Sequence, residues 1–175
     1  GDTTLEDGAD LITASAGTSN TRIGVNAGNS ITSGGNYNVV VGDEAGTAIT
    51  TGDKNVAIGF EALATEDTGK SSVAVGYQAL KTLNNDAENH NTAIGSLAGT
   101  AMTTGTSNTR IGSAAGDALT SGNNNTVLGY AALSADTLGD RSVAIGRHAL
   151  TAQNFTTTTD AYNVAVGYNS GVAMT

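Results

Sequence analysis

The chain contains no cysteine, no proline and no tryptophan, and aromatic residues make up only 4% of its 175 residues. Without cysteine, neither a disulfide framework nor thiol chemistry is available, and the redox compartment is left open. The lack of proline, with glycines that do not recur at every third position, excludes a collagen-like triple helix. Because aromatic side chains supply much of the buried area of a globular core, their scarcity argues against one broad core.

Basic residues are also scarce, with 7 lysines and arginines against 16 aspartates and glutamates and a net charge of −9. Nucleic acids and anionic membrane surfaces require a basic surface, so neither is expected as a partner. No apolar run approaches the length of a membrane span, and we therefore expect no direct insertion into a membrane. The histidines, His90 and His148, lack metal-ligand spacing, which predicts no metal site and no cofactor.

What the chain does have is a short repeated phrase, [Asn/Ser]-x-x-[Ile/Val/Leu]-Gly-x-x-Ala, which occurs nine times at intervals near 17 residues, with Ser170 in place of the final alanine in the last copy. Residues 55–62 are its clearest copy. Self-similarity at a fixed short period predicts a solenoid in which each repeat forms one coil. The glycines of the phrase, called marker glycines below, are Gly24, Gly42, Gly59, Gly76, Gly95, Gly112, Gly129, Gly146 and Gly167.

The residues before each marker glycine predict a short β-strand. Three residues before it stands Val or Thr, and one residue before it stands Ile, Val or Leu. Positions two apart share one face of a strand, so we expect this pair to point into the coil. The marker glycine itself is expected at a sharp bend with positive φ or a close backbone approach.

The position between these two is mostly alanine, and we expect it on the opposite face, packed against another copy of the chain. Two of its members are arginines in identical stretches, residues 18–24 and 106–112. An unpaired charge on a packed face is unfavourable, so each arginine is expected to have a carboxylate or carbonyl partner from a neighbouring chain. The candidate inter-subunit residues are Arg22, Arg110, Ala57, Ala74, Ala93, Ala144 and Ala165.

The second half of the coil occurs in two versions, with either Gly or Leu directly after the conserved alanine. The versions alternate in pairs, which gives a larger unit of four coils, and each supplies one long aliphatic side chain for the core. Two long polar connections, residues 81–90 and 151–162, occupy equivalent places in this unit and are expected to bulge outward. We predict two regions: an irregular N-terminal capping segment, residues 1–19, and a nine-coil β-solenoid, residues 20–175.

The phrase Asn-x-Val-Ala-Ile-Gly-x-x-Ala resembles the head repeats of YadA-type trimeric autotransporter adhesins. Residues 73–80 and 91–95 are similar to the same repeat as it occurs in phage tail fibres and related surface fibres. The resemblance covers about residues 20–175. It implies an all-β, left-handed parallel β-roll, packed side by side as a homotrimer and displayed outside the cell, on a cell surface or a virion. The coils are longer than the repeats usual in adhesin heads, and both settings remain open.

No catalytic constellation emerges from the sequence. Glu61, Glu66 and Asp67 form no repeated pair suited to glycoside cleavage and are expected in a solvated turn. We therefore expect a non-enzymatic fibre or adhesin segment that mediates or supports attachment to a host-surface glycan or protein. A purely structural spacer is the alternative, and an ice-binding solenoid or a polysaccharide-active enzyme is less favoured. Ice binding is suggested by threonines at equivalent positions: Thr32, Thr50, Thr103 and Thr120. Four aromatic residues follow marker glycines: Phe60, Tyr77, Tyr130 and Tyr168. Their rings would stack on sugars if exposed, but we favour packing between subunits.

Overall fold

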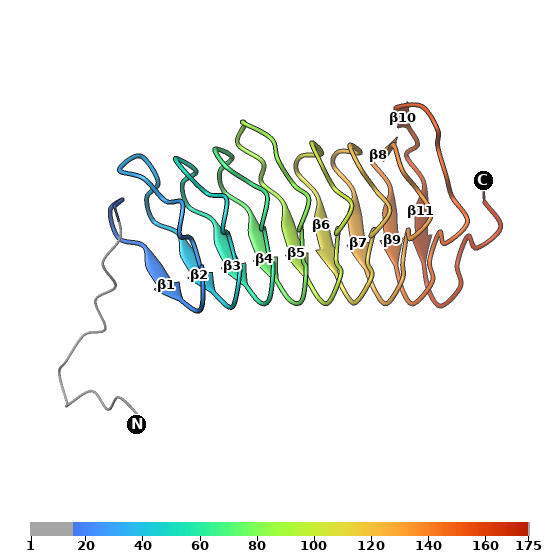
Figure 1. The fold of residues 1–175 in the computed structure, drawn as a ribbon. Helices are drawn as coiled ribbons and strands as arrows, with labels where there is room; N and C mark the ends of the chain where they lie inside the picture. The colour runs from blue at the N-terminus through green and yellow to red at the C-terminus, as the bar shows by residue number, and fades with distance from the viewer. Residues whose placement is uncertain (1–15, 175) are drawn as a thin grey trace, which may run out of the picture.

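The chain forms an all-β parallel solenoid of about nine turns with a period of about 17 residues. The computed structural model describes residues 16–174, and no helix occurs among them. Most of the predicted capping segment, including its apolar residues Leu5, Leu11 and Ile12, lies outside the described residues. The coils follow one another in chain order from the N-terminal to the C-terminal end of the stack (Figure 1).

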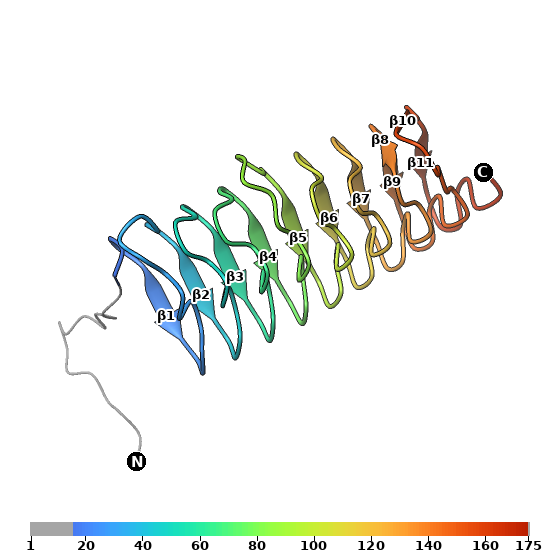
Figure 2. The ribbon, with the colours of Figure 1, turned by 45° about the horizontal axis from the view of Figure 1, so that its top comes forward.

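One nine-stranded parallel sheet runs along the whole stack, and each coil contributes one three-residue strand to it. Figure 2 shows these strands as a single row. Neighbouring strands pair in register, so that Val56 lies beside Val73 and Ala57 beside Ala74. The repeated phrase therefore places equivalent residues directly above one another. The strands are β1 (Thr21–Ile23), β2 (Val39–Val41), β3 (Val56–Ile58), β4 (Val73–Val75), β5 (Thr92–Ile94), β6 (Thr109–Ile111), β7 (Thr126–Leu128), β9 (Val143–Ile145) and β11 (Val164–Val166).

The strand faces are the reverse of the sequence prediction. In β3 the central Ala57 is fully buried, whereas Val56 is only partly buried and Ile58 is 37% exposed. The reason is the narrow interior of the coil. A Cβ added to Gly46, on the opposite side of the coil, would lie 2.7 Å from Cγ1 of Val40, so the two walls are already in contact. The small central residue therefore points inward, and the larger flanking pair points outward.

The two versions of the second half-coil share one backbone conformation. The glycines of the first version, such as Gly46 and Gly116, have φ near +50° to +64°, and the leucines of the second version, such as Leu63 and Leu133, have φ of 48° to 52°. The versions differ in the side chain and not in the path of the chain. All four of these leucines are buried, which confirms their predicted role in the core: Leu63, Leu80, Leu133 and Leu150.

The marker glycines behave as predicted, with φ between 125° and 138°. A Cβ on Gly59 would lie 2.5 Å from the carbonyl oxygen of Gly76 in the next coil. Both the left-handed conformation and this close approach of two backbones exclude a side chain.

Asparagines four residues before the marker glycine form a ladder of side-chain hydrogen bonds along the stack. The main-chain N–H of Asn38 donates to Oδ1 of Asn20 at 2.8 Å, and its side-chain amide donates across the coil to the carbonyl of Gly52 at 2.8 Å. Each such asparagine therefore joins two coils and both walls of its own coil. The same two bonds recur at Asn55, Asn108 and Asn125.

The two long connections project from the same edge of the stack (Figure 1). The second one contains β10 (Thr159–Asp160), which pairs in parallel with β8 (Gly139–Asp140) of the preceding coil. The first one makes the equivalent contact through an isolated bridge between Lys70 and Glu88. Both loops therefore extend the stacking beyond the main sheet.

Candidate functional site

The outward-facing side chains of the nine-stranded sheet form one continuous row, called the outer strand face below, in which every residue one before a marker glycine is Ile, Val or Leu and the residues three before it are Val or Thr. It consists of the residues three and one before each marker glycine. Isolated exposed leucines or isoleucines are ordinary, but a row of this length on one face is not. Its apolar members exposed by more than a third are Ile23 (46%), Ile58 (37%), Ile94 (39%), Ile111 (36%), Leu128 (44%), Val164 (69%) and Val166 (64%), and three of its threonines, Thr21, Thr109 and Thr126, are exposed as well.

The alanines predicted at an inter-subunit contact lie inside the coil of their own chain. The prediction for them is therefore wrong, and its physical reason is the narrow interior described above. The residues concerned are Ala57, Ala74, Ala93 and Ala144, all fully buried, and Ala165, 3% exposed.

The two arginines of the candidate set also point into the coil. Arg22 has a carbonyl partner, as predicted, but from its own chain: its Nε donates to the oxygen of Ala27 at 2.8 Å. Arg110 is fully buried, and its only hydrogen bond is from an Nη atom to Sδ of Met102 at 3.1 Å. Its Nε and second Nη have no partner, so the expected carboxylate or carbonyl is absent among the described residues.

The stacking of the coils explains why Arg22 has a carbonyl partner and Arg110 has none. Ala115 is the counterpart of Ala27, but its carbonyl already accepts the N–H of Gly99 from the preceding coil at 3.1 Å. Arg110 therefore finds no free carbonyl at the place where Arg22 finds one. Burial lowers the pKa of the Arg110 guanidinium to about 9. Its stem nevertheless packs well, because it fills the space beside Gly99 and Gly116.

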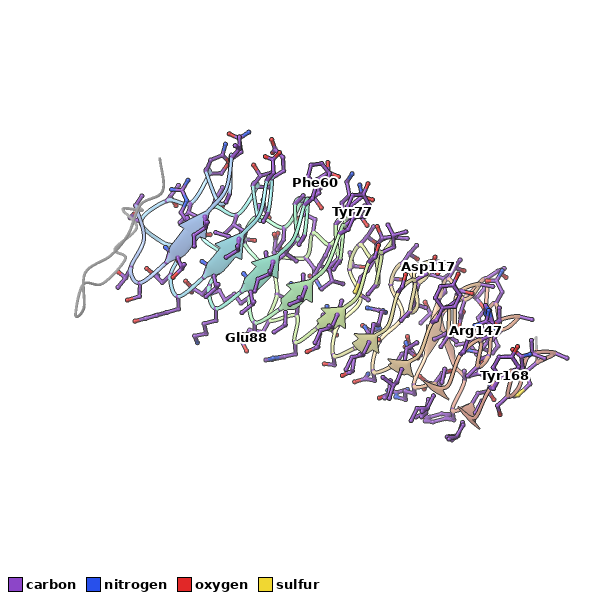
Figure 3. The ribbon with its side chains drawn as sticks, turned by 90° about the horizontal axis from the view of Figure 1, so that it is seen from below. Phe60, Tyr77, Glu88, Asp117, Arg147 and Tyr168 are labelled. Carbon is purple, nitrogen blue, oxygen red and sulfur yellow. The ribbon has the colours of Figure 1, made fainter. Side chains whose placement is uncertain are left out.

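Side chains directly after the marker glycines form a second exposed surface, the aromatic edge: Phe60, Tyr77, Tyr130, Arg147 and Tyr168. The rings of Phe60 and Tyr77 stack with centroids 5.7 Å apart and planes 12° apart. The guanidinium carbon of Arg147 lies 5.5 Å from the ring centroid of Tyr130 and 5.6 Å from that of Tyr168. Figure 3 shows Phe60 and Tyr77 along one long edge of the stack and Glu88 on the opposite edge.

Two buried carboxylates were missed by the sequence prediction. Glu66, expected in a solvated turn, is fully buried and accepts the N–H of Gly69 at 2.8 Å and the side-chain amide of Asn89 at 2.9 Å. Burial raises the pKa of Glu66 to about 7. Asp136, four coils later, is equally buried and accepts the amide of Gln153 at 2.6 Å.

The signal for these acids was present in the repeat. Both stand seven residues after a marker glycine, a position that holds buried aliphatic side chains such as Ile49 and Leu119 in other coils. Four steps of about 4.8 Å place Glu66 and Asp136 roughly 19 Å apart. Glycosidase carboxylates act at about 5–10 Å, so these two do not form such a pair within one chain.

Other candidate chemistry finds little support in the part of the chain that the structure describes. No group of three or more His, Cys, Asp or Glu side chains suited to a metal ion occurs among residues 16–174. Each of the two histidines contacts another side chain. His148 lies edge-on to the ring of Tyr130, and Nε2 of His90 lies 3.3 Å from a carboxylate oxygen of Glu88. The threonines proposed for ice binding each donate their hydroxyl to a carbonyl of the next coil: Thr32, Thr50, Thr103 and Thr120.

Comparison with known proteins gives no relative. No family model, no curated protein and no solved structure matches the chain. The described residues include no helix long and apolar enough to cross a membrane. The argument about function therefore rests on the two exposed surfaces.

Proposed function

We propose that the chain is a segment of a non-enzymatic homotrimeric fibre, an adhesin head or a tail-fibre segment, that mediates attachment to a host surface. The observation that carries the proposal is the outer strand face. A monomer would leave this apolar row in water along all nine coils, whereas two further copies would cover it.

The size of the row supports an interface. Eight steps of about 4.8 Å give a length of roughly 38 Å, and a three-residue strand is about 10 Å long, so the face covers roughly 400 Å² in projection. Apolar patches of this size on soluble proteins commonly mark interaction sites.

A second copy of the chain is the partner whose chemistry fits best. The row repeats with the spacing of the coils, and any other copy carries the same row at the same spacing. Side chains of two copies can therefore interdigitate along the whole length, which an irregular surface would not match. Three chains around one axis, each a left-handed roll, agree with the resemblance to YadA-type head repeats, as does a location outside the cell on a cell surface or virion.

The mass in solution tests the assembly. Light scattering of the wild-type chain of 17.3 kDa is expected to give three times that value, about 52 kDa. Replacing Ile58 and Ile94 together by Asp should reduce the mass to that of a monomer, because two charges per chain would be buried in the interface. A matched control, Ser33→Asp with Thr104→Asp, places the same charges at exposed positions nine residues after a marker glycine.

Two results would contradict the proposal in different ways. A wild-type monomer would contradict the trimer itself. A trimer that survives Ile58→Asp with Ile94→Asp, as the control does, would show that another face forms the contact. Binding of the purified trimer to whole host cells then tests attachment directly.

A purely structural spacer is the second candidate, and the regular hydrogen bonding between coils favours it. A rod in which every coil is bonded in the same way to the next is stiff over its whole length. A spacer would form the trimer but would not bind cells. Cell binding by this segment alone therefore separates the two functions.

A further inference from the structure

Arg147 on the aromatic edge is held in an unusual setting for an exposed basic residue. It is the side chain after the marker glycine of the eighth coil, and the side chains in the same position of the seventh and ninth coils are Tyr130 and Tyr168. The tyrosine rings lie on either side of its guanidinium at 5.5 and 5.6 Å. Stacking between rungs therefore orders a side chain that is normally mobile.

This arrangement leaves the hydrogen-bonding groups of the guanidinium available. A guanidinium carries five N–H donors in one plane. One Nη atom lies 3.2 Å from the hydroxyl oxygen of Tyr168, to which it donates. The remaining donors, on a side chain that is exposed to solvent, form a planar fork suited to a carboxylate or sulfate.

No carboxylate among the described residues compensates the charge of Arg147. Lys70, Lys81 and Arg141 each form an ion pair with a carboxylate, while Arg22 and Arg110 point into the coil. No ion pair joins Arg147 to any described carboxylate, and Asp117, on the same edge in Figure 3, is no exception.

Two exposed basic residues, Lys54 and Arg147, thus have no carboxylate partner in the described part of the chain, whose net charge is −9 over its full length. Lys54 has no ring on either side, so only Arg147 combines an uncompensated charge with a fixed orientation.

The geometry points to an acidic-saccharide site formed by Tyr130, Arg147 and Tyr168, with the edge-on ring of His148 beside Tyr130. The guanidinium fork binds the carboxylate or sulfate of the sugar, and the exposed tyrosine side chains, 51% and 68% accessible, contact its apolar C–H groups and hydroxyls. The assignment rests on the proposed attachment function and gives it a ligand class. Because the whole chain is acidic, recognition of an anion has to be local, which is what a single oriented guanidinium provides.

The test uses the wild-type trimer and three defined probes: 3′-sialyllactose, lactose 3′-sulfate and neutral lactose. Titration followed by NMR should show binding of one or both acidic probes and much weaker binding of lactose. The two acidic probes distinguish a carboxylate ligand from a sulfate ligand. Arg147→Gln should weaken acidic binding by about tenfold or more, and Arg147→Lys should recover only part of it, because lysine keeps the charge but not the planar fork.

Lys54→Gln is the matched control, since it removes the other unpaired exposed charge and should leave binding unchanged. Light scattering on each variant verifies that the assembly is intact. The inference is overturned if neither acidic probe binds, if lactose binds equally well, or if Lys54→Gln weakens binding as much as Arg147→Gln. None of these results contradicts the trimer or its binding to cells. A monomeric wild type would contradict the proposed function, but the titration could be carried out on the monomer as well.

Discussion

Replacement of Arg110 by methionine tests whether a charge without a partner limits the stability of the solenoid. Arg110 is fully buried, with two of its guanidinium nitrogens unpartnered. Burial holds its pKa at about 9, well below the ordinary value of an arginine. At about 1.36 kcal/mol for each pKa unit, this difference corresponds to roughly 5 kcal/mol that the folded chain loses by keeping the guanidinium charged at neutral pH.

Methionine retains most of the aliphatic stem that fills the space beside Gly99 and Gly116, and it introduces no charge. Exchanging a buried charged group for an apolar side chain of similar volume commonly stabilises by about 1–4 kcal/mol. We therefore expect Arg110→Met to raise the free energy of unfolding by about 2–4 kcal/mol, which corresponds to a rise in Tm of roughly 5–10 °C. Thermal and urea unfolding, at one protein concentration for both chains because an assembly is involved, would measure it.

The pH dependence provides an independent check with a defined sign. Above pH 9 the folded chain releases the Arg110 proton, whereas the unfolded chain keeps it to a far higher pH. The unfolded state then binds more protons, so the stability of the wild type rises with pH relative to the methionine variant. The difference between the two chains should therefore shrink by roughly 1 kcal/mol from pH 8 to pH 10.

Arg22→Met is the matched control, since Arg22 occupies the same position in an identical stretch but has a carbonyl partner. We expect no stabilisation there, because the substitution removes a hydrogen bond. If Arg110→Met is no more stable than the wild type, or if Arg22→Met is stabilised by the same amount, the reasoning is refuted. The first result would mean that the Arg110 guanidinium is compensated in solution, and the second that the gain does not depend on the missing partner.

Two further substitutions test the buried acid and the marker glycines. The free energy of unfolding of the wild type should fall by about 3 kcal/mol as the pH rises from 4.5 to 7, because the folded chain releases the Glu66 proton at a higher pH than the unfolded chain. Glu66→Gln should remove this fall; an equal change in stability of the two chains between pH 5 and pH 8 would contradict the prediction. Gly95→Ala should destabilise by about 2 kcal/mol or more beyond Gly167→Ala, because both have positive φ but only a Cβ at Gly95 meets a carbonyl, that of Gly112 at 2.5 Å. Equal loss of thermal stability in the two variants would show that the carbonyl contact is harmless.

Local features of the fold could be predicted because they depend on one residue type at one place. The position of each strand, the positive φ of Gly59 and the side-chain bonds of Asn38 all follow from preferences that the neighbours do not alter. Repetition strengthened each prediction, since the same residue recurs in coil after coil. The predicted strand positions and the positive φ of the marker glycines were confirmed.

The side-chain partners of Arg110 and Glu66 could not be predicted in the same way. Their environments depend on which atoms of the neighbouring coils are already bonded, such as the Ala115 carbonyl occupied by Gly99. The burial of Glu66 could be predicted only from its position in the repeat, which is that of Ile49 and Leu119 in other coils. Its acidic side chain indicated an exposed turn instead. Both errors came from reading a residue by its type alone when its place in the stack decides its contacts.

The reversed strand faces have a different origin, and they bear on assembly. The prediction that Val56 and Ile58 point inward assumed that the larger apolar side chains of a strand belong to the core of their own chain. In a coil whose walls touch, the central residue of each strand, such as Ala57 or Val40, points inward, and the flanking side chains lie outside. A chain that functions as a monomer would be expected to place polar residues there. Since this one retains Ile, Val or Leu one residue before every marker glycine, the pattern that misled the prediction about the core is the strongest argument that this face is covered by other copies of the chain.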